Sequence, residues 1–363
     1  MTLQHIPSVP HLVLVYGGQS AEHEVSLVSA RNVFHAIDRT RYVVTLVRID
    51  RDGTWVRVAT VSGTPPSQID FQAPGESVFL KPDGGLAPIE SPQDAVHVDV
   101  VFPVLHGTNG EDGAIQGLFQ IYKVPYVGAG VLGSSVCMDK DVSKRLLREA
   151  GIAVPDFRVL HNGETNLPSY DYLARVLGKT LFVKPANTGS SIGISRVESL
   201  MEYQSAIEEA FKYDEKVLVE EAITGREIEC AVLGRNPVRV SVCGEITTTH
   251  SFYSYQAKYE DESATEIIIP ASIPEVVMTR IQDLARRTCR VLDCFGMARV
   301  DFFLEKDNRV LVNEVNTIPG FTSVSMYPML WDYSGMSFSD LVDALIQDAF
   351  VTHHRRSQLI RSR

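Results

Sequence analysis

Two short runs near the C-terminus predict a hairpin with one polar face: Arg299-Val300-Asp301-Phe302 and Asn313-Glu314-Val315-Asn316. Side chains on a strand alternate between its two faces, so Arg299 and Asp301 share one face. Glu314 and Asn316 share a face for the same reason. Asp307-Asn308 lies between the runs, is flanked by strand-like residues and predicts a two-residue turn. Pairing outward from that turn sets the two acids opposite each other, with Arg299 opposite Asn316.

The polar face of this predicted hairpin would carry two carboxylates, one amide oxygen and one guanidinium. Hard oxygen ligands of this kind suit Mg²⁺, which usually takes one or two carboxylates together with substrate phosphates. A solvated sheet face with a cross-strand ion pair is the alternative, and the hairpin alone does not choose between them. The polar, glycine-containing run 317–325 follows directly and favours the ligand-binding interpretation.

Length and composition exclude several classes of protein. A chain of 363 residues is too long for one ordinary core, so we expect two or three domains. A formal net charge of −11 argues against nucleic acid as the main partner. The five cysteines form no CxxC pair, no apolar run reaches the roughly 18–20 residues of a membrane span, and a signal peptide is not evident. We therefore expect a cytoplasmic protein without a membrane partner, and a frayed, solvated end for the basic segment 353–363.

The pattern of apolar residues predicts an N-terminal α/β domain. A buried strand at 12–16, a helix at 24–37 and a strand at 43–49 form a βαβ start, which implies a parallel sheet. Residues 60–95 are rich in proline and glycine and show no clear period, so we expect an irregular insertion there. Further strands are expected at 98–104, 181–185, 194–197 and 216–220, and helices at about 138–151, 199–213, 275–293 and 337–350. Candidate domain boundaries fall near residues 128 and 224.

Two segments in the middle of the chain could bind a nucleotide. The loop 187–193 follows Lys184 between two strands, and successive N–H groups of such a Gly/Ser loop can cradle phosphate, although many such loops are only turns. The strand that ends at Glu220-Glu221 could place a base between apolar side chains, and Glu227 could accept hydrogen bonds from ribose. Surface acids at a strand end are the alternative for this second segment.

Three further segments carry polar groups that could meet a substrate. Glu22 lies in the first strand-to-helix loop, where ligands of parallel sheets bind, and it could hold an ammonium group or only favour the helix dipole. His106 opens a polar loop at another strand end, although a lone histidine is more often structural. The aromatic and polar stretch around Lys258 and Tyr259 is typical of a lid that excludes water.

Eight motifs in order resemble the D-alanine–D-alanine ligase family of ATP-grasp enzymes: GGQSAEHEVS, HGTNGEDG, MDK, VKPANTGSSIG, VLVEEAITGRE, FYSYQAKY, MARVDFF and NEVNTIPGFTSVSMYP. The resemblance extends from about Val13 to Phe350, whereas the stretch 51–95 looks like an insertion of longer members. It implies a three-domain ATP-grasp architecture of mixed α/β (α+β) class. We expect an N-terminal α/β domain at 1–128, a central ATP-grasp domain at 129–224 and a C-terminal catalytic domain at 225–363 with a lid loop at 250–262. A homodimer is usual for the family and common among oligomers in general.

The resemblance also implies the residues of an active site at the junction of the three domains. Two Mg²⁺ ions, for which Mn²⁺ could substitute, would be held by Asp301, Glu314 and Asn316. ATP would be bound by Lys140, Lys184, Ser190, Ser191, Glu220, Glu221, Ile223, Glu227 and Lys258. D-Alanine would be bound by Glu22, His106, Ser325 and Met326. The catalytic set would comprise Glu22, Ser190, Tyr259, Arg299, Gly320 and Ser325.

The implied reaction is ATP-dependent ligation of two D-alanines to D-alanyl-D-alanine for peptidoglycan synthesis, through a D-alanyl phosphate and a tetrahedral intermediate. Relatives that make D-alanyl-D-lactate carry His at the place of Tyr259, so Tyr259 favours an amine as the second substrate. Glu221 departs from the family, in which Lys is often found there. The alternatives are another ATP-grasp ligase that uses a different acid and a nucleotide-binding regulatory protein without turnover. Glu22 and the Tyr259 lid speak against the first, and the intact hairpin residues against the second.

Overall fold

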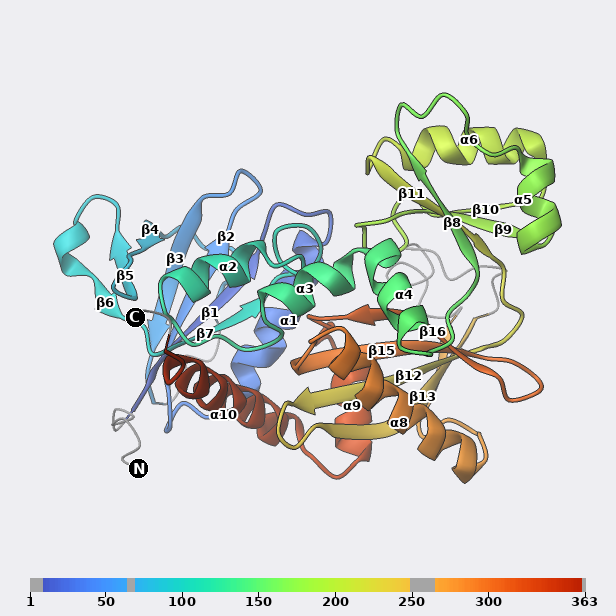
Figure 1. Cartoon of the computed structure of the whole chain (residues 1–363). Helices are drawn as coiled ribbons and strands as arrows, with labels where there is room; N and C mark the ends of the chain where they lie inside the picture. The colour runs from blue at the N-terminus through green and yellow to red at the C-terminus, as the bar shows by residue number, and fades with distance from the viewer. Residues whose placement is uncertain (1–8, 64–68, 249–264, 361–363) are drawn as a thin grey trace.

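The computed structural model describes residues 9–63, 69–248 and 265–360. Three sheets, each built from its own consecutive stretch of chain, dominate the architecture (Figure 1). Their strand orders are β6-β5-β4-β3-β2-β1-β7, β10-β9-β11-β8 and β14-β13-β12-β15-β16. This mixed α/β arrangement agrees with the predicted fold class. Within the described ranges, no helix is both long and apolar enough to cross a membrane.

The first sheet begins with the predicted βαβ unit. Strand β1 (His11–Gly17) is followed by α1 (His23–Ala36) and β2 (Val43–Ile49), and β1 pairs in parallel with both β2 and β7 (Val100–Val104). His11 is half-buried and every later residue of β1 is buried, as expected for a central parallel strand. Parallel strands end at one edge, so the loops after β1 and β7 emerge side by side. Those two loops carry Glu22 and His106.

The prediction of an irregular insertion at 60–95 is wrong. Four strands join the β2 edge of the first sheet in antiparallel order: β3 (Trp55–Val61), β4 (Glu76–Leu80), β5 (Gly85–Pro88) and β6 (Val96–His97), with the short 3₁₀ helix η1 (Pro92–Asp94) between the last two. Val56, Val78 and Leu86 are buried under this extension. The strands are only two to seven residues long and are separated by Pro/Gly turns. Such short runs hardly display the two-residue period from which strands are recognised.

The second sheet is antiparallel and carries its helices on one side (Figure 1). It contains β8 (Phe157–His161), β9 (Leu181–Pro185), β10 (Ser195–Val197) and β11 (Lys216–Glu221), with α5 (Tyr170–Leu177) and α6 (Leu200–Ala210) packed around a shared core. The helix expected at 138–151 is confirmed as α4 (Lys140–Glu149), and a further helix that was not expected, α3 (Val131–Met138), precedes it. They are separated by Asp139, whose side chain accepts hydrogen bonds from the N–H groups of Asp141 and Val142 and so caps α4.

The third sheet contains the predicted hairpin. Its strands are β12 (Arg226–Gly234), β13 (Arg239–Thr248), β14 (Thr265–Ile268), β15 (Gly296–Leu304) and β16 (Val310–Asn316), and α8 (Glu275–Val291) and α9 (Met326–Tyr333) pack against it. Helix α2 (Ala114–Ile121) belongs to the first sheet instead, because its Ile115 and Phe119 share the core of that sheet. The pairing of Asp301 with Glu314 and of Arg299 with Asn316 is confirmed. The predicted two-residue turn is wrong, because residues 305–309 join the strands and Leu304 pairs with Val310. A bulge at Asn313 restores the predicted register beside the site.

The last helix, α10 (Phe338–Ser357), joins the first and third sheets. It packs against α1 and β7 on one side and against β12 and β15 on the other, as the dark red helix in Figure 1 shows. Leu341 and Leu345 of α10 share a core with Phe34, Phe102 and residues of the third sheet. The expected end at residue 350 and the frayed basic segment are wrong for residues 351–357, which continue the helix. Arg356 even donates a hydrogen bond from Nη1 to the Tyr126 hydroxyl at 3.2 Å.

Candidate active site

Arg299 is the buried cation at the centre of the hairpin. Its Nε lies 2.7 Å from Oδ1 of Asp301 and 2.8 Å from Oε2 of Glu229, and its Nη2 donates to Oδ2 of Asp301 at 2.7 Å. Burial alone would lower the pKa of Arg299, but the carboxylates of Asp301 and Glu229 outweigh it and hold that pKa well above its ordinary value. The guanidinium is therefore permanently charged, and its five N–H groups exceed those used in these ion pairs.

The hairpin face offers oxygen atoms suited to a divalent cation. Oδ1 of Asn316 is buried and has no hydrogen-bond partner among the described residues, an arrangement that needs a reason because buried polar atoms are normally paired. The Asp301 and Glu314 carboxylates lie on the same face, and Oε2 of Glu314 is 3.7 Å from Nζ of Lys140. The described residues hold no group of three or more His, Cys, Asp or Glu side chains able to bind a metal. The possible metal ligands on this face are the oxygen atoms of two carboxylates and one amide. Such hard oxygen ligands fit Mg²⁺ or Mn²⁺ rather than a softer metal.

The small-residue loop after β9 has the backbone conformation of an anion cradle. Ser190 and Ser191 have φ angles of 49° and 60°, a left-handed region that non-glycine residues rarely adopt and that concentrates at functional sites. Consecutive backbone N–H groups in such turns converge on a bound anion. Lys140 reaches the same loop, with Nζ donating to the Thr188 carbonyl oxygen at 2.6 Å and its backbone N–H donating to the Ala186 carbonyl oxygen at 3.0 Å.

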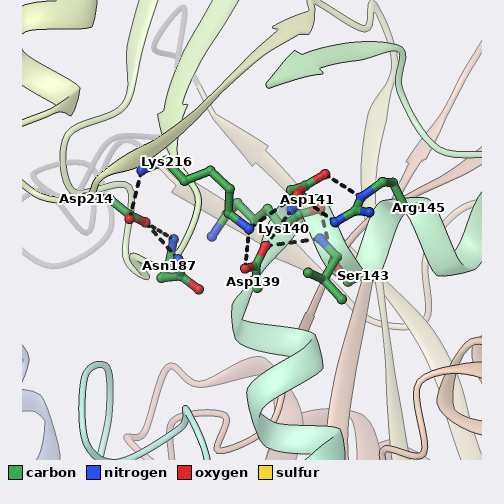
Figure 2. Close-up of polar contacts among 9 residues, drawn as sticks. Asp139, Lys140, Asp141, Ser143, Arg145, Asn187, Asp214 and Lys216 are labelled. Atoms are coloured by element: carbon green, nitrogen blue, oxygen red, sulfur yellow. Dashed lines mark hydrogen bonds and ion pairs between the residues drawn. The ribbon is translucent and has the colours of Figure 1, made fainter. Parts of the chain in front are cut away.

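A polar cluster ties the start of α4 to the stem of this loop (Figure 2). Lys216 forms ion pairs with Asp139 and, at 3.3 Å, with Asp141. Asp214 accepts hydrogen bonds from the backbone N–H of Asn187 at 2.7 Å and from its side-chain amide at 2.9 Å. Because Lys216 and Asp214 lie at the start of β11, one strand end fixes both the helix that carries Lys140 and the loop that Lys140 contacts.

A buried row of charges lies beside the loop. Glu220 is 1% exposed and receives Nζ of Lys144 at 2.7 Å on one oxygen and Nζ of Lys184 at 2.6 Å on the other. Burial alone would raise the pKa of Glu220, but the two lysines outweigh it and lower that pKa to about 2. Burial lowers the pKa of Lys144, and Glu220 opposes that shift. Glu220 is therefore an ionised carboxylate whose two oxygens are both directed at lysines.

Glu22 connects the loop after β9 to the first sheet. The Ser190 hydroxyl donates a hydrogen bond to Oε1 of Glu22, which is buried. A Cβ on Gly189 would lie 3.3 Å from Oε2 of Glu22, so the loop backbone also approaches this carboxylate. A buried carboxylate that faces a cavity is able to hold an ammonium group.

The run 317–325 after the hairpin is fixed by polar groups of the first sheet. His106 Nδ1 lies 2.9 Å from the Ile318 carbonyl oxygen, and Glu111 accepts hydrogen bonds from the N–H groups of Gly107 at 2.7 Å and Ile318 at 3.3 Å. The Ser29 hydroxyl accepts from the N–H of Phe321 at 3.1 Å. Elements some 200 to 290 residues apart in sequence thus hold one loop in place.

Gly320 and Ser325 lie together at the far end of this loop. A Cβ on Gly320 would come within 2.7 Å of the Ser325 hydroxyl oxygen, so any larger residue here would force Ser325 to shift. Ser325 Oγ accepts a hydrogen bond from the N–H of Thr322 at 2.9 Å. Ser325 is also the N-cap residue of α9, and Met326 is the first residue of that helix. The backbone N–H of Met326 belongs to the N-terminus of α9, where an anionic group is favoured.

Two adjoining cavities collect the predicted site residues. The first, of about 170 Å³, is here called the Glu22 cavity and is also lined by His106, Asn316, Gly320, Ser325 and Met326. The second, of about 280 Å³, is here called the Lys184 cavity and is also lined by Ser191, Glu220, Glu221, Ile223, Glu227 and Asp301. Lys140, Ser190, Arg299 and Glu314 line both cavities. Every predicted site residue within the described ranges therefore faces one of the two, whereas Lys258, Tyr259 and the expected lid at 250–262 lie outside the described residues.

Comparison with known sequences identifies the family. Residues 11–129 match the family described as "D-ala D-ala ligase N-terminus", and residues 146–347 match "D-ala D-ala ligase C-terminus". The chain belongs to the D-alanine–D-alanine ligase family. A D-alanine–D-alanine ligase A of Chromobacterium violaceum is 46% identical over 96% of this chain and 97% of its own length. The D-alanine–D-alanine ligase A of Escherichia coli K12 is 45% identical over 94% of this chain and 95% of its own.

Solved structures of the D-alanine–D-alanine ligase family have the same fold. The ligase from Coxiella burnetii is 37% identical, has a TM-score of 0.83 and covers 97% of this chain and 98% of its own. A D-Ala:D-Ser ligase from Enterococcus faecalis is 35% identical, has a TM-score of 0.81 and covers 94% of this chain and 99% of its own. These likenesses confirm the ATP-grasp architecture expected from the motifs.

Three buried residues of this family member were missed by sequence reasoning: Lys144, Glu111 and Glu229. Lys144 lies one helical turn after Lys140, so its position on the same face of α4 was a usable signal. Glu229 follows Glu227 at strand spacing and pairs with Arg299. Glu111 lies in the loop opened by His106, and nothing in its spacing pointed to Ile318.

Proposed function

We propose that the protein ligates two D-alanines to D-alanyl-D-alanine with conversion of ATP to ADP and phosphate, for peptidoglycan synthesis. One observation carries the proposal: in a chain related over its full length to named D-alanine–D-alanine ligases, a nucleotide-sized and a smaller cavity meet at Lys140, Ser190, Arg299 and Glu314. A phosphoryl donor in one cavity and an amino acid in the other would react at that junction.

ATP would occupy the Lys184 cavity. The base would lie against Ile223, with Glu227 accepting from the ribose and Lys140 and Lys184 facing the phosphates. The left-handed loop of Ser190 and Ser191 would cover the phosphates with backbone N–H groups. Glu220 has both oxygens directed at lysines, and so its part in binding adenine, like that of Glu221 and Lys258, stays a prediction.

The Glu22 cavity would hold the two D-alanines. Glu22 would bind the ammonium of the first, close to His106, and the carboxylate of the second would meet Ser325 and the N–H of Met326. A carboxylate is a poor electrophile, so phosphoryl transfer to the first D-alanine precedes attack by the amine of the second. Arg299 and the N–H of Gly320 would stabilise the oxyanion that develops during this attack. Tyr259 would take part from the lid.

Asp301, Glu314 and Asn316 would hold Mg²⁺ or Mn²⁺, and their oxygen donors suit these ions. When bound, the metal neutralises charge on phosphate oxygens during phosphoryl transfer. The three-domain division, the homodimer, the cytoplasmic location and the lack of a nucleic-acid or membrane partner likewise remain predictions of the proposal.

Phosphate release in the presence of ATP, Mg²⁺ and D-alanine tests this function. We expect release with D-alanine and none with L-alanine, and a product that contains two D-alanines. No stimulation by D-alanine would refute the proposal. Adding D-serine or D-lactate in competition with D-alanine then measures the choice of second substrate, and preferential D-alanyl-D-serine formation would favour the function named for the Enterococcus faecalis relative.

A further inference from the structure

Lys144 is a fully buried lysine that none of the assigned roles uses. It is 1% exposed and pairs with Glu220 at 2.7 Å, yet it lines neither the Glu22 cavity nor the Lys184 cavity. Glu220 and Lys184, its neighbours in the buried row, both line the Lys184 cavity. Lys144 therefore contacts the lining of the Lys184 cavity through Glu220, and the more distant charges of Lys184 and Glu314 also act on it.

The number of charges in the row gives Lys144 a purpose. Without Lys144, Lys184 and Glu220 would form a pair whose opposite charges cancel. With Lys144 present, the row contains two cations and one anion, and Lys184 is the member of that row that is positive and faces the cavity. The low dielectric of a buried site makes this single net charge weigh far more than it would at the surface.

We propose that Lys144 is a positioning residue that neutralises Glu220 from outside the cavity, and thereby leaves the ammonium of Lys184 available to the phosphates of ATP. The proposal rests on the assignment of ATP to the Lys184 cavity. It goes further in giving Glu220 a second task, which is to anchor Lys184 in place when no nucleotide is bound. Lys144 itself touches neither the nucleotide nor the reacting atoms.

The alternative is that Lys144 only stabilises the fold. A purely structural lysine would weaken binding of every nucleotide fragment alike, or would affect only the thermal unfolding temperature. A lysine that acts through the charge of Lys184 would affect phosphate-bearing ligands selectively. Adenosine and ADP differ in phosphates alone, so they separate the two cases.

The test measures binding of ADP and of adenosine by calorimetry at fixed Mg²⁺ to the full chain, to Lys144→Met and to Lys144→Met/Glu220→Gln. Lys144→Met should weaken ADP binding by about tenfold or more, and should change adenosine binding much less. The double variant removes the anion together with its partner and returns a net positive charge to Lys184. It should therefore bind ADP more tightly than Lys144→Met does.

A matched control is Lys212→Met, which removes an exposed lysine shortly after α6. In the described structure, Lys212 forms an ion pair only with Glu209, at 2.6 Å. It should bind ADP like the unaltered protein, and so exclude an effect of net charge alone. In steady-state assays, Lys144→Met should raise KM for ATP and leave KM for D-alanine nearly unchanged.

Equal weakening of ADP and adenosine, or a double variant that binds ADP no better than Lys144→Met, would overturn the proposal. If thermal unfolding shows that Lys144→Met does not fold, the double variant alone still decides. It has no unpaired buried carboxylate, and it must bind ADP if the charge of Lys184 suffices. A failure of the function itself looks different, since the unaltered protein would then release no phosphate with D-alanine, whether or not it binds ADP.

Discussion

The Ser190 hydroxyl donates a hydrogen bond to the Glu22 carboxylate across 168 positions of sequence. It joins the phosphate-facing loop after β9 to the first strand-to-helix loop, and thus one side of the nucleotide cavity to the proposed ammonium site. Binding of ATP and of the first D-alanine should consequently be coupled, because each ligand orders one partner of the same hydrogen bond.

Replacing Ser190 by Ala should lower kcat/KM for D-alanine by about ten- to a hundredfold, since hydrogen bonds to charged groups contribute roughly 1.5–3 kcal/mol. A double-mutant cycle with Glu22→Gln isolates the pair, and the two losses should be less than additive. Thr180→Val is a suitable control, because it removes another hydroxyl–carboxylate bond, to Glu198 at 2.9 Å, outside both cavities. Additive losses would show that Ser190 and Glu22 act independently.

Arg299 should be essential both to catalysis and to the stability of the hairpin. Arg299→Ala removes an oxyanion donor, a change that typically lowers transition-state stabilisation by about 3–4 kcal/mol. It also leaves Asp301 and Glu229 without their buried cation, so the free energy of unfolding should fall by roughly 3–5 kcal/mol. Steady-state kinetics and urea unfolding measure the two effects separately.

Arg299→Lys discriminates charge from shape in the same experiment. A lysine keeps the charge but cannot match two carboxylates with a planar fork, and so it should restore part of the stability and little of kcat. Arg226→Ala provides the control, because Arg226 makes a two-pronged pair with Glu245 on the neighbouring strand, away from the proposed chemistry. Near-normal kcat in Arg299→Ala would contradict the assigned role.

The hairpin shows what the sequence was able to predict. Alternation of side chains placed Asp301 opposite Glu314 correctly, although the turn was assigned to the wrong residues. Two local deviations compensate: the connection is longer than a two-residue turn, and the bulge at Asn313 shifts the register back. Face and pairing depend on which residues must be buried, whereas turn length and bulges depend on local backbone geometry that no residue type marks clearly.

The buried charges show where the sequence reaches its limit. Glu220 was recognised as a strand-end acid, but its two lysines come from α4 and β9, far away along the chain. Contacts of this kind depend on how α4 packs against the second sheet, and periodicity describes only one element at a time. The prediction for the basic end of α10 was wrong for the same reason, because the helix continues where it packs against the first sheet.

Asn316 should be required for binding a divalent cation. Its buried Oδ1 lacks a partner among the described residues, so a leucine of similar size should fold well and yet remove one metal ligand. We expect Asn316→Leu to weaken Mn²⁺ binding by at least about tenfold, or about 1.4 kcal/mol, in electron paramagnetic resonance titrations with ADP present. Asn308→Gly, in the turn of the same hairpin, should bind Mn²⁺ normally. Unchanged Mn²⁺ affinity in Asn316→Leu would place the cation elsewhere.

Chelation of divalent cations extends that prediction to the whole protein. Treatment with EDTA should abolish phosphate release, and either Mg²⁺ or Mn²⁺ should restore it, because both accept hard oxygen ligands. Ca²⁺, which prefers more ligands at longer distances, should restore less. Full activity in the presence of EDTA would show that the hairpin acids serve only as partners of Arg299.

Glu220 should make the protein sensitive to acid over a defined range of pH. Its pKa is lowered from 4.5 to about 2 in the folded protein by Lys144 and Lys184, which outweigh burial. Between these two values the unfolded chain binds more protons than the folded one, so the stabilisation is present above about pH 4.5 and is lost as the pH falls towards 2. Glu220→Gln abolishes this contribution. The difference in unfolding free energy between about pH 6 and pH 3, measured with urea, should therefore be smaller in Glu220→Gln than in the unaltered protein. Glu208→Gln, which removes an exposed carboxylate from α6 beside the same sheet, should show the pH dependence of the unaltered protein. If Glu220→Gln also shows that pH dependence, the buried row does not hold an ionised carboxylate.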